Sequence, residues 1–277
     1  MLDFPIVDTH VHLLLNGGIP YRSLQGNYTL DTYNKASESV NVDSIVFMEC
    51  DCEITHYREE VAFASGLAQV DKRIKGIVAS MPVEKGAVIE GEIFELIKNP
   101  LVKGVRRLLK FEKNDFCLSE KFIQGVQLLG KYNLSFDLCT AIEQNKNAAK
   151  LVKNCSDVSF IVDHIGTPDI KGGRFALWRE GMKRLSDLPN VWCKLSSLAT
   201  EADHEHWTVG DIRPYVEYLF KTFGTDRVLF GGDWPVSLVS ASFTRSVALL
   251  EDLVSGYSRD EKIKIFRENA IKFYKLK

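Results

Sequence analysis

Short runs of apolar and β-branched residues recur along the chain, and most are followed by a longer segment with apolar residues at helical spacing. The runs predict eight strands: Ile6–His10, Ser44–Cys50, Ile74–Ser80, Val102–Leu108, Leu134–Cys139, Val158–His164, Val191–Ser196 and Val228–Gly231. The amphipathic segments predict helices: Thr55–Val70, Val88–Lys98, Glu120–Lys131, Asn145–Lys153, Phe175–Leu185, Ile212–Phe223, Phe243–Val254 and a last one, Arg259–Tyr274, across the outside or bottom of the fold. This alternation is typical of a parallel sheet with crossover helices. Eight strands favour a distorted TIM (β/α)8 barrel, one domain over residues 1–277.

Composition narrows the class of protein. The 277 residues carry a formal net charge of -2, so we expect neither nucleic acid nor a membrane surface as a partner. The six cysteines form no CxxC pair, which suits small buried side chains in a reducing compartment. The first residues have no signal-peptide pattern, and no stretch reaches the roughly 20 apolar residues of a membrane span. We expect a cytoplasmic protein, either a monomer or a homodimer.

The longest loop-like stretch is Leu13–Thr29, which contains three glycines and a proline. It is predicted to lie over the mouth of the barrel. The Gly17-Gly18 pair is either the hinge of a lid or part of an ordinary surface loop.

Polar and titratable residues gather where the predicted strands end. In a TIM barrel, the catalytic groups lie at the carboxyl ends of the strands. The residues in question are His10 and His12, Glu49, Arg106, Asp137, His164, Lys194 and Asp233. Strand interiors stay apolar, so this pattern predicts an active site at the barrel mouth.

Three of these positions point to hydrolytic chemistry. His10 and His12 are spaced i, i+2 and therefore leave the same side of a strand, as a metal site or an acid/base site requires. Asp233 follows Gly231-Gly232, so it emerges from a buried strand into the mouth. It is predicted to be a general base toward water or a metal ligand, the alternative being a helix cap. His164 is either a ligand or carbonyl donor, or a half-buried structural histidine.

Two cationic residues are predicted to point inward. Arg106 shares the parity of Gly104 and Leu108, and an inward arginine needs an anion or a carbonyl, which favours a substrate role. Lys194 would need a partner such as Asp163 or Glu49, and a purely structural ion pair is the alternative. Other mouth residues have weaker signals: Trp178, Trp207 and Trp234 line the pocket or pack in the core, and Glu201, His204 and His206 are taken as solvated.

Several of these segments together resemble the amidohydrolase superfamily, in particular the sugar-lactonase branch of fuconolactonases, rhamnonolactonases and pyrone-dicarboxylate lactonases. The resemblance rests on residues 8–12 (DTHVH), 103–107 (KGVRR), 162–168 (VDHIGTP), 192–198 (WCKLSSL) and 223–236 (FGTDRVLFGGDWPV). It implies a TIM barrel that opens a lactone ring on a small sugar-derived acid. Asp233 would activate water, while His10, His12 and His164 would bind a metal or polarise the carbonyl. Substrate contacts are assigned to Arg106, Lys194, Trp234 and Asp137.

The chain departs from the family pattern in two places. Asp137 and Cys139 stand on the fifth strand where many metal-dependent relatives have a histidine, and Lys110, the nearest candidate for a carbamate-forming lysine, lies past the fourth strand. A binuclear centre is therefore not expected. The alternatives are one divalent ion, with zinc the first choice, held by His10, His12, Asp233 and Glu49, or catalysis without a metal.

Two rival functions remain open from the sequence. One is a nonoxidative decarboxylase of the same superfamily that acts on a small unsaturated or aromatic acid. The other is a barrel that has lost catalysis and only binds a sugar acid, against which the retained Asp233 and the histidine pair argue.

Overall fold

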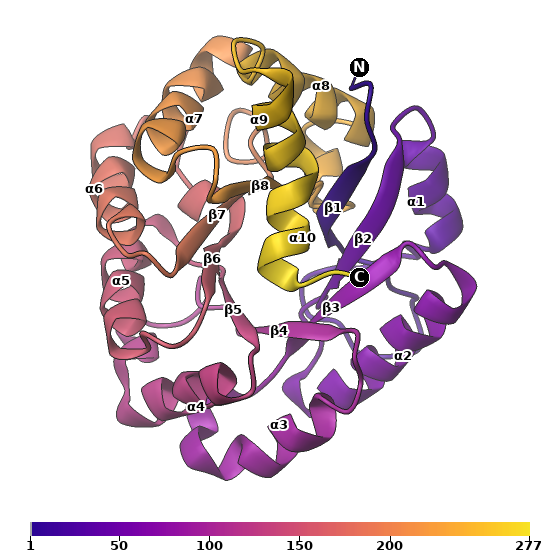
Figure 1. Ribbon diagram of the computed structural model, residues 1–277, viewed down its shortest axis with the longest axis vertical. Coiled ribbons are helices and arrows are strands. Elements are labelled where there is room, and N and C mark those ends of the chain that lie inside the picture. Colours follow the sequence, from indigo (N-terminus) through magenta and orange to yellow (C-terminus); the bar gives the residue numbers. More distant parts are fainter. Residues whose placement is uncertain (1) are drawn as a thin grey trace.

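The computed structural model describes residues 2–277. Eight parallel strands form one sheet in the order β1 to β8, with helices around them (Figure 1). The strands are β1 (Ile6–Val11), β2 (Val42–Met48), β3 (Ile74–Ser80), β4 (Val102–Arg106), β5 (Ser135–Leu138), β6 (Phe160–Val162), β7 (Val191–Leu195) and β8 (Val228–Phe230). The α-helices are α1 (Leu30–Ser37), α2 (Tyr57–Val70), α3 (Glu90–Leu96), α4 (Glu120–Lys131), α5 (Asn145–Asn154), α6 (Phe175–Ser186), α7 (Val209–Phe223), α8 (Phe243–Leu253), α9 (Arg259–Ile263) and α10 (Asn269–Tyr274).

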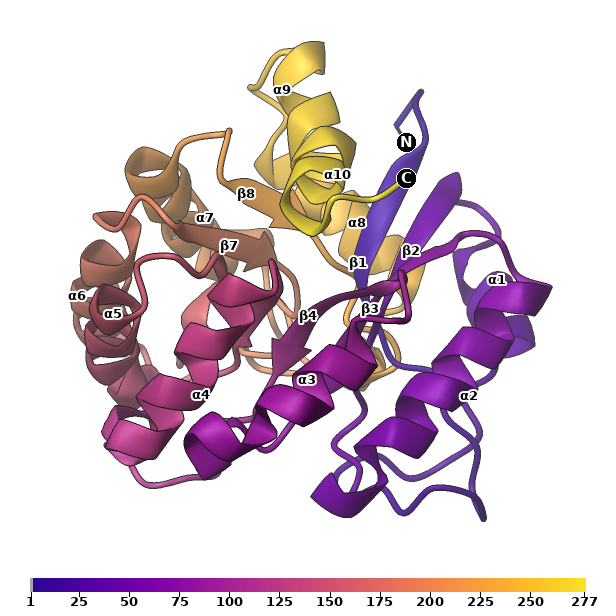
Figure 2. The same ribbon diagram turned by 60° about the horizontal axis from the view of Figure 1, so that its bottom comes forward.

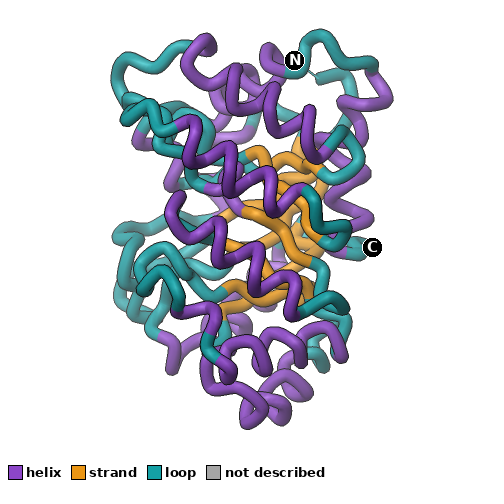
Figure 3. Tube along the Cα trace, turned by 90° about the vertical axis from the view of Figure 1, so that its left-hand side faces the viewer, coloured by secondary structure: helices purple, strands orange, loops and turns teal. Residues whose placement is uncertain are grey.

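The sheet closes where β1 meets the end of β8. Val11 forms a parallel bridge with Trp234, and the next residue, His12, donates its backbone N–H to the carbonyl of Trp234 at 2.9 Å. The hydroxyl of Thr9 donates to the carbonyl of Phe230 at 2.5 Å. This closure confirms the TIM barrel predicted from the strand count. In side view the strands lie enclosed by the surrounding helices (Figure 3).

All eight predicted strands are present, but several end earlier than the hydrophobic pattern indicates. β4 stops at Arg106 rather than Leu108, and β6 stops at Val162 rather than His164. His164 has a left-handed backbone (φ 51°), which cannot continue a strand. The early ends therefore turn polar residues into the barrel mouth.

Helix α1 was not predicted, because its residues are mostly polar and follow a long loop. Thr29 caps it, since its hydroxyl accepts from the N–H of Thr32 at 3.3 Å. Only Leu30, Tyr33 and Ser37 of this helix are buried. Tertiary packing of one face, rather than an apolar stripe, thus stabilises it.

The last helical segment covers the bottom of the barrel, as predicted. Helices α9 and α10 are joined by a π-helical turn at Lys264–Glu268 into one segment. It lies at the end of the barrel where the strands begin (Figure 2). Phe273 and Tyr274 pack against inward-facing residues of the strands, including Val46 and Leu229.

All six cysteines are free and buried, as small apolar side chains would be. Within residues 2–277, no helix combines the length and the apolar character needed to cross a membrane.

Candidate active site

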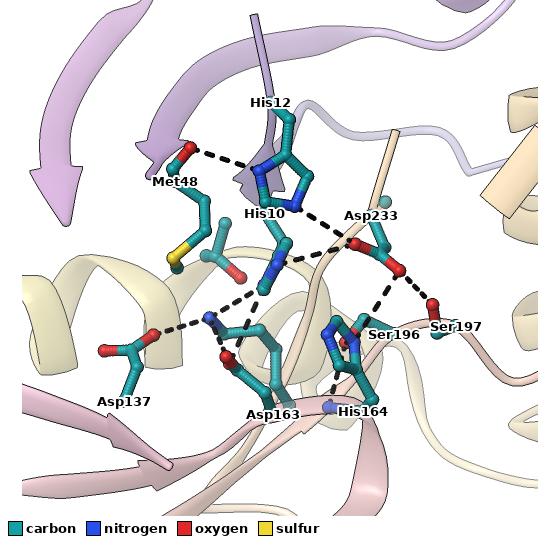
Figure 4. A network of polar contacts seen from close by, with 12 residues as sticks. His10, His12, Met48, Asp137, Asp163, His164, Ser196, Ser197 and Asp233 are labelled. Atoms are coloured by element: carbon teal, nitrogen blue, oxygen red, sulfur yellow. Dashed lines mark hydrogen bonds and ion pairs between the residues drawn. The ribbon is translucent and has the colours of Figure 1, made fainter. Parts of the chain in front are cut away.

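The two histidines of the first strand converge on one carboxylate at the barrel mouth (Figure 4). His10 comes from β1, His12 from the residue just after it, and Asp233 from the loop after β8. The Nε2 atom of His10 lies 3.5 Å from Oδ1 of Asp233, and Nε2 of His12 lies 3.4 Å from the same oxygen. The prediction that His10 and His12 leave the same side of the strand is therefore confirmed.

Glycines let β8 pass close enough to bring Asp233 to these rings. A Cβ at Gly231 would lie 2.9 Å from the Cβ of His10, which real Cβ atoms do not tolerate. The N–H of Gly232 donates to Oδ1 of Asp8 at 2.7 Å, which fixes the turn that presents Asp233.

The second oxygen of Asp233 faces the other side of the mouth. The hydroxyl of Ser197, after β7, donates to Oδ2, and Nδ1 of His164 lies 3.8 Å from it. Burial alone would raise the pKa of Asp233, but the nearby His164 and His12 and the Ser197 hydroxyl hold it well below its usual range. Asp233 is therefore ionised at neutral pH.

His12 is oriented by the backbone of β2. Its Nδ1 lies 3.2 Å from the carbonyl oxygen of Met48, which can only accept, so Nδ1 carries the proton and donates it. In the neutral ring, Nε2 then presents a lone pair to the Asp233 carboxylate. Two acceptors facing each other at 3.4 Å require a cation or a shared proton between them.

His10 is held from below by buried charges. Its Nδ1 lies 3.2 Å from Nζ of Lys194 and 3.6 Å from Oδ1 of Asp163. Burial lowers the pKa of His10 well below its usual value, and Lys194 and the other histidines lower it further. The ring is therefore neutral, and Lys194 and Asp163 compete to set its tautomer.

Arg106 occupies the middle of the site, pointing inward as its parity predicts. Its Nε donates to Oε1 of Glu49 at 2.5 Å and its Nη2 to the carbonyl of Glu49 at 2.8 Å. Its Nη1 lies 3.4 Å from Oδ2 of Asp163 and 3.1 Å from Nε2 of His10. Burial alone would lower the pKa of Arg106, but Glu49 and Asp163 raise it, so the guanidinium stays charged.

Several mouth residues have backbones in the left-handed region that non-glycine residues rarely adopt. They include Asp51 (φ 58°), His164 (φ 51°), Ser197 (φ 54°) and Asp233 (φ 52°). Each follows a strand end, at β2, β6, β7 and β8. Such strain gathers at functional sites, where the surrounding fold enforces it.

A pocket of about 190 Å³ opens above these groups. His12, Arg106, His164 and Asp233 line it. Its walls carry a polar set (Ser23, Asp51, Lys110, Ser197, Thr200, Glu201) and a less polar set (Leu24, Cys50, Leu108, Phe111, Cys139, Val236). Ser23 and Leu24 come from the loop Leu13–Thr29, so its predicted place over the mouth is confirmed.

Other predicted site residues lie behind the pocket wall rather than on it. Lys194 and Asp137 are fully buried beneath His10, where Nζ of Lys194 lies 2.8 Å from carboxylate oxygens of both Asp137 and Asp163. Of its two predicted partners, Lys194 pairs with Asp163 and not with Glu49. The Trp234 side chain packs against Tyr28 and Tyr33 and is 2% exposed.

The sequence left two places open for the side chains of Trp178, Trp207 and Trp234, the pocket lining or the core. The structure confirms the core. Trp178 packs against Tyr215, and Trp207 lies under the guanidinium of Arg245. Neither these two nor Trp234 lines the pocket.

The sequence interpretation of Glu201 as a solvated charge is wrong. The residue is half-buried in the pocket wall, and burial raises its pKa to about 7. Its neighbours His204 and His206 are exposed, as expected. No motif in the sequence indicates the pocket roles of Glu201 and Ser197. Their position just after β7 is the only hint, because loops at this end of a barrel line the site.

Two sets of three side chains within residues 2–277 bring potential metal ligands within 4.8 Å of one another. One is His10, His12 and Asp233, and the other is His10, Asp163 and His164. The structure does not bring Glu49 into either set. Its carboxylate accepts from Arg106 and, at 2.7 Å, from the N–H of Asp51.

Glu60 of α2 is a buried carboxyl group next to the site. Its Oε1 accepts from the N–H of Cys50 at 2.9 Å, and burial, reinforced by Glu49, raises its pKa to about 8. The folded state thus binds this proton more tightly than the unfolded chain does. The resulting stabilisation is fully present below the unfolded pKa near 4.5 and is lost as pH rises through about 8.

Glu60→Gln is therefore expected to raise the free energy of unfolding by about 1 to 3 kcal/mol at pH 9 and by much less at pH 5. Urea unfolding at the two pH values measures this. The exposed neighbour Glu59, changed to Gln, is the matched control and should show little pH-dependent difference. A Glu60→Gln effect that is equal at both pH values would contradict the assignment of a buried, proton-binding carboxyl group.

Comparison with known proteins gives consistent likenesses. A family model described as amidohydrolase matches residues 7–276. An L-fucono-1,5-lactonase of Burkholderia multivorans is 29% identical over 234 residues, which are 79% of this chain and 77% of that protein. An L-rhamnono-gamma-lactonase of Scheffersomyces stipitis is 24% identical over 339 aligned positions and is covered completely, as is this chain.

The fold is also similar to that of a solved amidohydrolase from Burkholderia multivorans. One crystal structure of it, with bound HEPES, has a TM-score of 0.89, and another, with bound zinc, has 0.87. Both are 23% identical and cover 99% of this chain and 100% of that one.

Proposed function

The chain belongs to the amidohydrolase family, and on that premise we propose that it is a lactonase that opens the ring of a small sugar-derived lactone. The lactonase names of its relatives support a hydrolase of ester bonds. The observation that carries the proposal is the ionised Asp233 carboxylate, which lines the pocket. The Nε2 atoms of His10 and His12 are both directed at its Oδ1.

The set of His10, His12 and Asp233 fits one divalent ion. Ligands about 2.0–2.1 Å from a tetrahedral zinc lie about 3.3–3.4 Å apart, and the two Nε2 to Oδ1 distances are 3.5 and 3.4 Å. The Nδ1 proton of His12 is held by a backbone carbonyl, the usual outer partner of a metal-bound histidine. When bound, such an ion would polarise the lactone carbonyl and lower the pKa of water.

The chain's own residues supply the remaining chemistry. Water attacks the carbonyl carbon, a new C–O bond forms, and Asp233 takes the proton. The guanidinium of Arg106, which lines the pocket and stays charged, stabilises the negative charge that develops on the carbonyl oxygen. The ring C–O bond then breaks, and the proton passes from Asp233 to the released alkoxide, which gives the hydroxy acid.

The charges of the pocket support a neutral, polyhydroxylated lactone rather than a dicarboxylate. Arg106 already faces Glu49 and Asp163. Lys110 is then the one cationic pocket residue that forms no ion pair with another residue among 2–277. Glu201 and Thr200 offer hydrogen-bonding groups to ring hydroxyls. Lys194, Asp137 and Trp234 would then act on the substrate only through the residues in front of them.

A pH-indicator screen of aldono-1,4- and 1,5-lactones tests the proposal. Acid release from a deoxy-sugar lactone is expected, and it should vanish on chelation and return with Zn²⁺. Acid release that continues after chelation would contradict the proposed metal ion but would still support the lactonase activity. No acid from any lactone, together with carbon dioxide from an unsaturated or aromatic acid, would replace the proposal with the decarboxylase.

A further inference from the structure

A chain of buried polar contacts runs through the barrel from its bottom to the ring of His10. The hydroxyl of Tyr274, in α10, donates to Oδ2 of Asp137 at 2.8 Å. Nζ of Lys194 donates to the same oxygen at 2.8 Å and lies 3.2 Å from Nδ1 of His10. Figure 4 shows Asp137 below His10.

Every member of the chain is shielded from solvent. Tyr274 is 1% exposed, and Asp137, Lys194 and His10 are 0% exposed. In such surroundings no water can replace a lost hydrogen bond, so a change at one end displaces its neighbours. Tyr274 and Lys194 share one oxygen of Asp137, so the tyrosine hydroxyl helps to fix where that carboxylate, and with it the ammonium group, lies.

The place of the ammonium group matters because Lys194 has a second carboxylate partner. Its Nζ lies 2.8 Å from Oδ1 of Asp163, and that oxygen is 3.6 Å from Nδ1 of His10. An ammonium group donates and never accepts. Nε2 of the same ring lies 3.1 Å from Nη1 of Arg106, which also can only donate, and the neutral ring can accept at one nitrogen only. An ammonium group held against Asp137 and Asp163 stays clear of Nδ1 and leaves the ring oriented with Nε2 toward Arg106 and Asp233.

We propose that Tyr274 is a positioning residue of the active site, which acts through Asp137 and Lys194 to fix the orientation of the His10 ring. Closing the bottom of the barrel requires only an apolar ring, which phenylalanine would supply equally well. The hydrogen bond from the hydroxyl to Asp137 is a contact that packing alone does not demand. The kinetic part of the test rests on the proposed lactonase function.

Tyr274→Phe tests this, with Tyr57→Phe as the matched control. Tyr57 also donates to a carboxylate, that of Glu92, but on the outer helices. Tyr274→Phe is expected to lower kcat about tenfold to a hundredfold, as loss of an outer partner of an active-site histidine does, with KM within about twofold. Tyr57→Phe should leave both unchanged. Equal kcat in Tyr274→Phe and the wild type would overturn the proposal.

A second measurement does not depend on activity. The ¹⁵N shifts of the His10 ring, measured at one pH in histidine-labelled protein, report the contacts of its two ring nitrogens. They are expected to change in Tyr274→Phe and to stay the same in Tyr57→Phe. Unchanged shifts would overturn the proposal even if activity fell. If the wild type opens no lactone, the proposed function fails while these shifts still decide the role of Tyr274. If Tyr274→Phe does not fold, Asp137→Asn is measured instead. Changed His10 shifts with a lower kcat would then support the proposal, and unchanged shifts would overturn it.

Discussion

Asp233→Asn is expected to lower kcat for lactone opening by about 10³- to 10⁴-fold, the upper part of the range for loss of a general base. The amide cannot take the proton of the attacking water, and it offers no negative charge between His10 and His12. The fold should persist, because asparagine can still accept from Ser197 and, of all non-glycine residues, tolerates the left-handed backbone at this position best. Steady-state kinetics and a thermal melt of the purified variant measure both effects.

Asp226→Asn supplies the matched control. It makes the same chemical change on a surface carboxylate that pairs with Lys264. Its turnover should match the wild type. Turnover of Asp233→Asn within a few-fold of the wild type would remove Asp233 from the mechanism.

Lys194→Met should lower the free energy of unfolding by about 3 to 5 kcal/mol, the usual cost of breaking a buried ion pair. The change leaves two carboxylates, those of Asp137 and Asp163, facing a site that has lost its ammonium group. Burial alone would lower the pKa of Lys194, but these carboxylates raise it, so the lysine is charged in the folded protein. Denaturant unfolding at pH 7 gives the difference.

The double variant Lys194→Met, Asp137→Asn separates charge from packing. Removal of one of the two stranded carboxylates should recover part of the lost stability, so the two changes should not be additive. Lys183→Met is the surface control. Its pair with Asp187 is exposed and should be worth about 1 kcal/mol or less. A Lys194→Met variant as stable as the wild type would show that the buried charges are compensated in another way.

The barrel could be predicted because its signals are local. β-Branched runs and helical spacing repeat along the chain, and each depends on neighbours within a few residues. Parity could also be predicted: Arg106 points inward and His10 and His12 share one side, since strand geometry fixes both from the sequence alone. The long-range contacts of the same residues could not be predicted. Glu49 was expected near a metal, yet it lies against Arg106.

The strand ends show the limit most clearly. Hydrophobicity extends the predicted strands through Leu108 and His164, but the chain leaves β4 and β6 two residues earlier. His164, Ser197 and Asp233 have left-handed backbones, and each contacts a residue of the loop that follows a neighbouring strand. The hydrophobic pattern along the sequence does not show such contacts, because they join residues that are far apart in the chain.

The sequence by itself determined that this protein is an eight-stranded barrel with histidines and a carboxylate at its mouth, because periodicity and strand order are properties of the chain. Only the tertiary structure decided which groups meet. It placed Glu201 in the pocket wall, Lys194 and Asp137 beneath it, and Tyr274 of the last helix against Asp137. Those meetings depend on strand register and on the packing of α10 against the barrel bottom. Both are set by contacts between residues far apart in the chain. The spacing of neighbouring residues in the sequence does not predict such contacts.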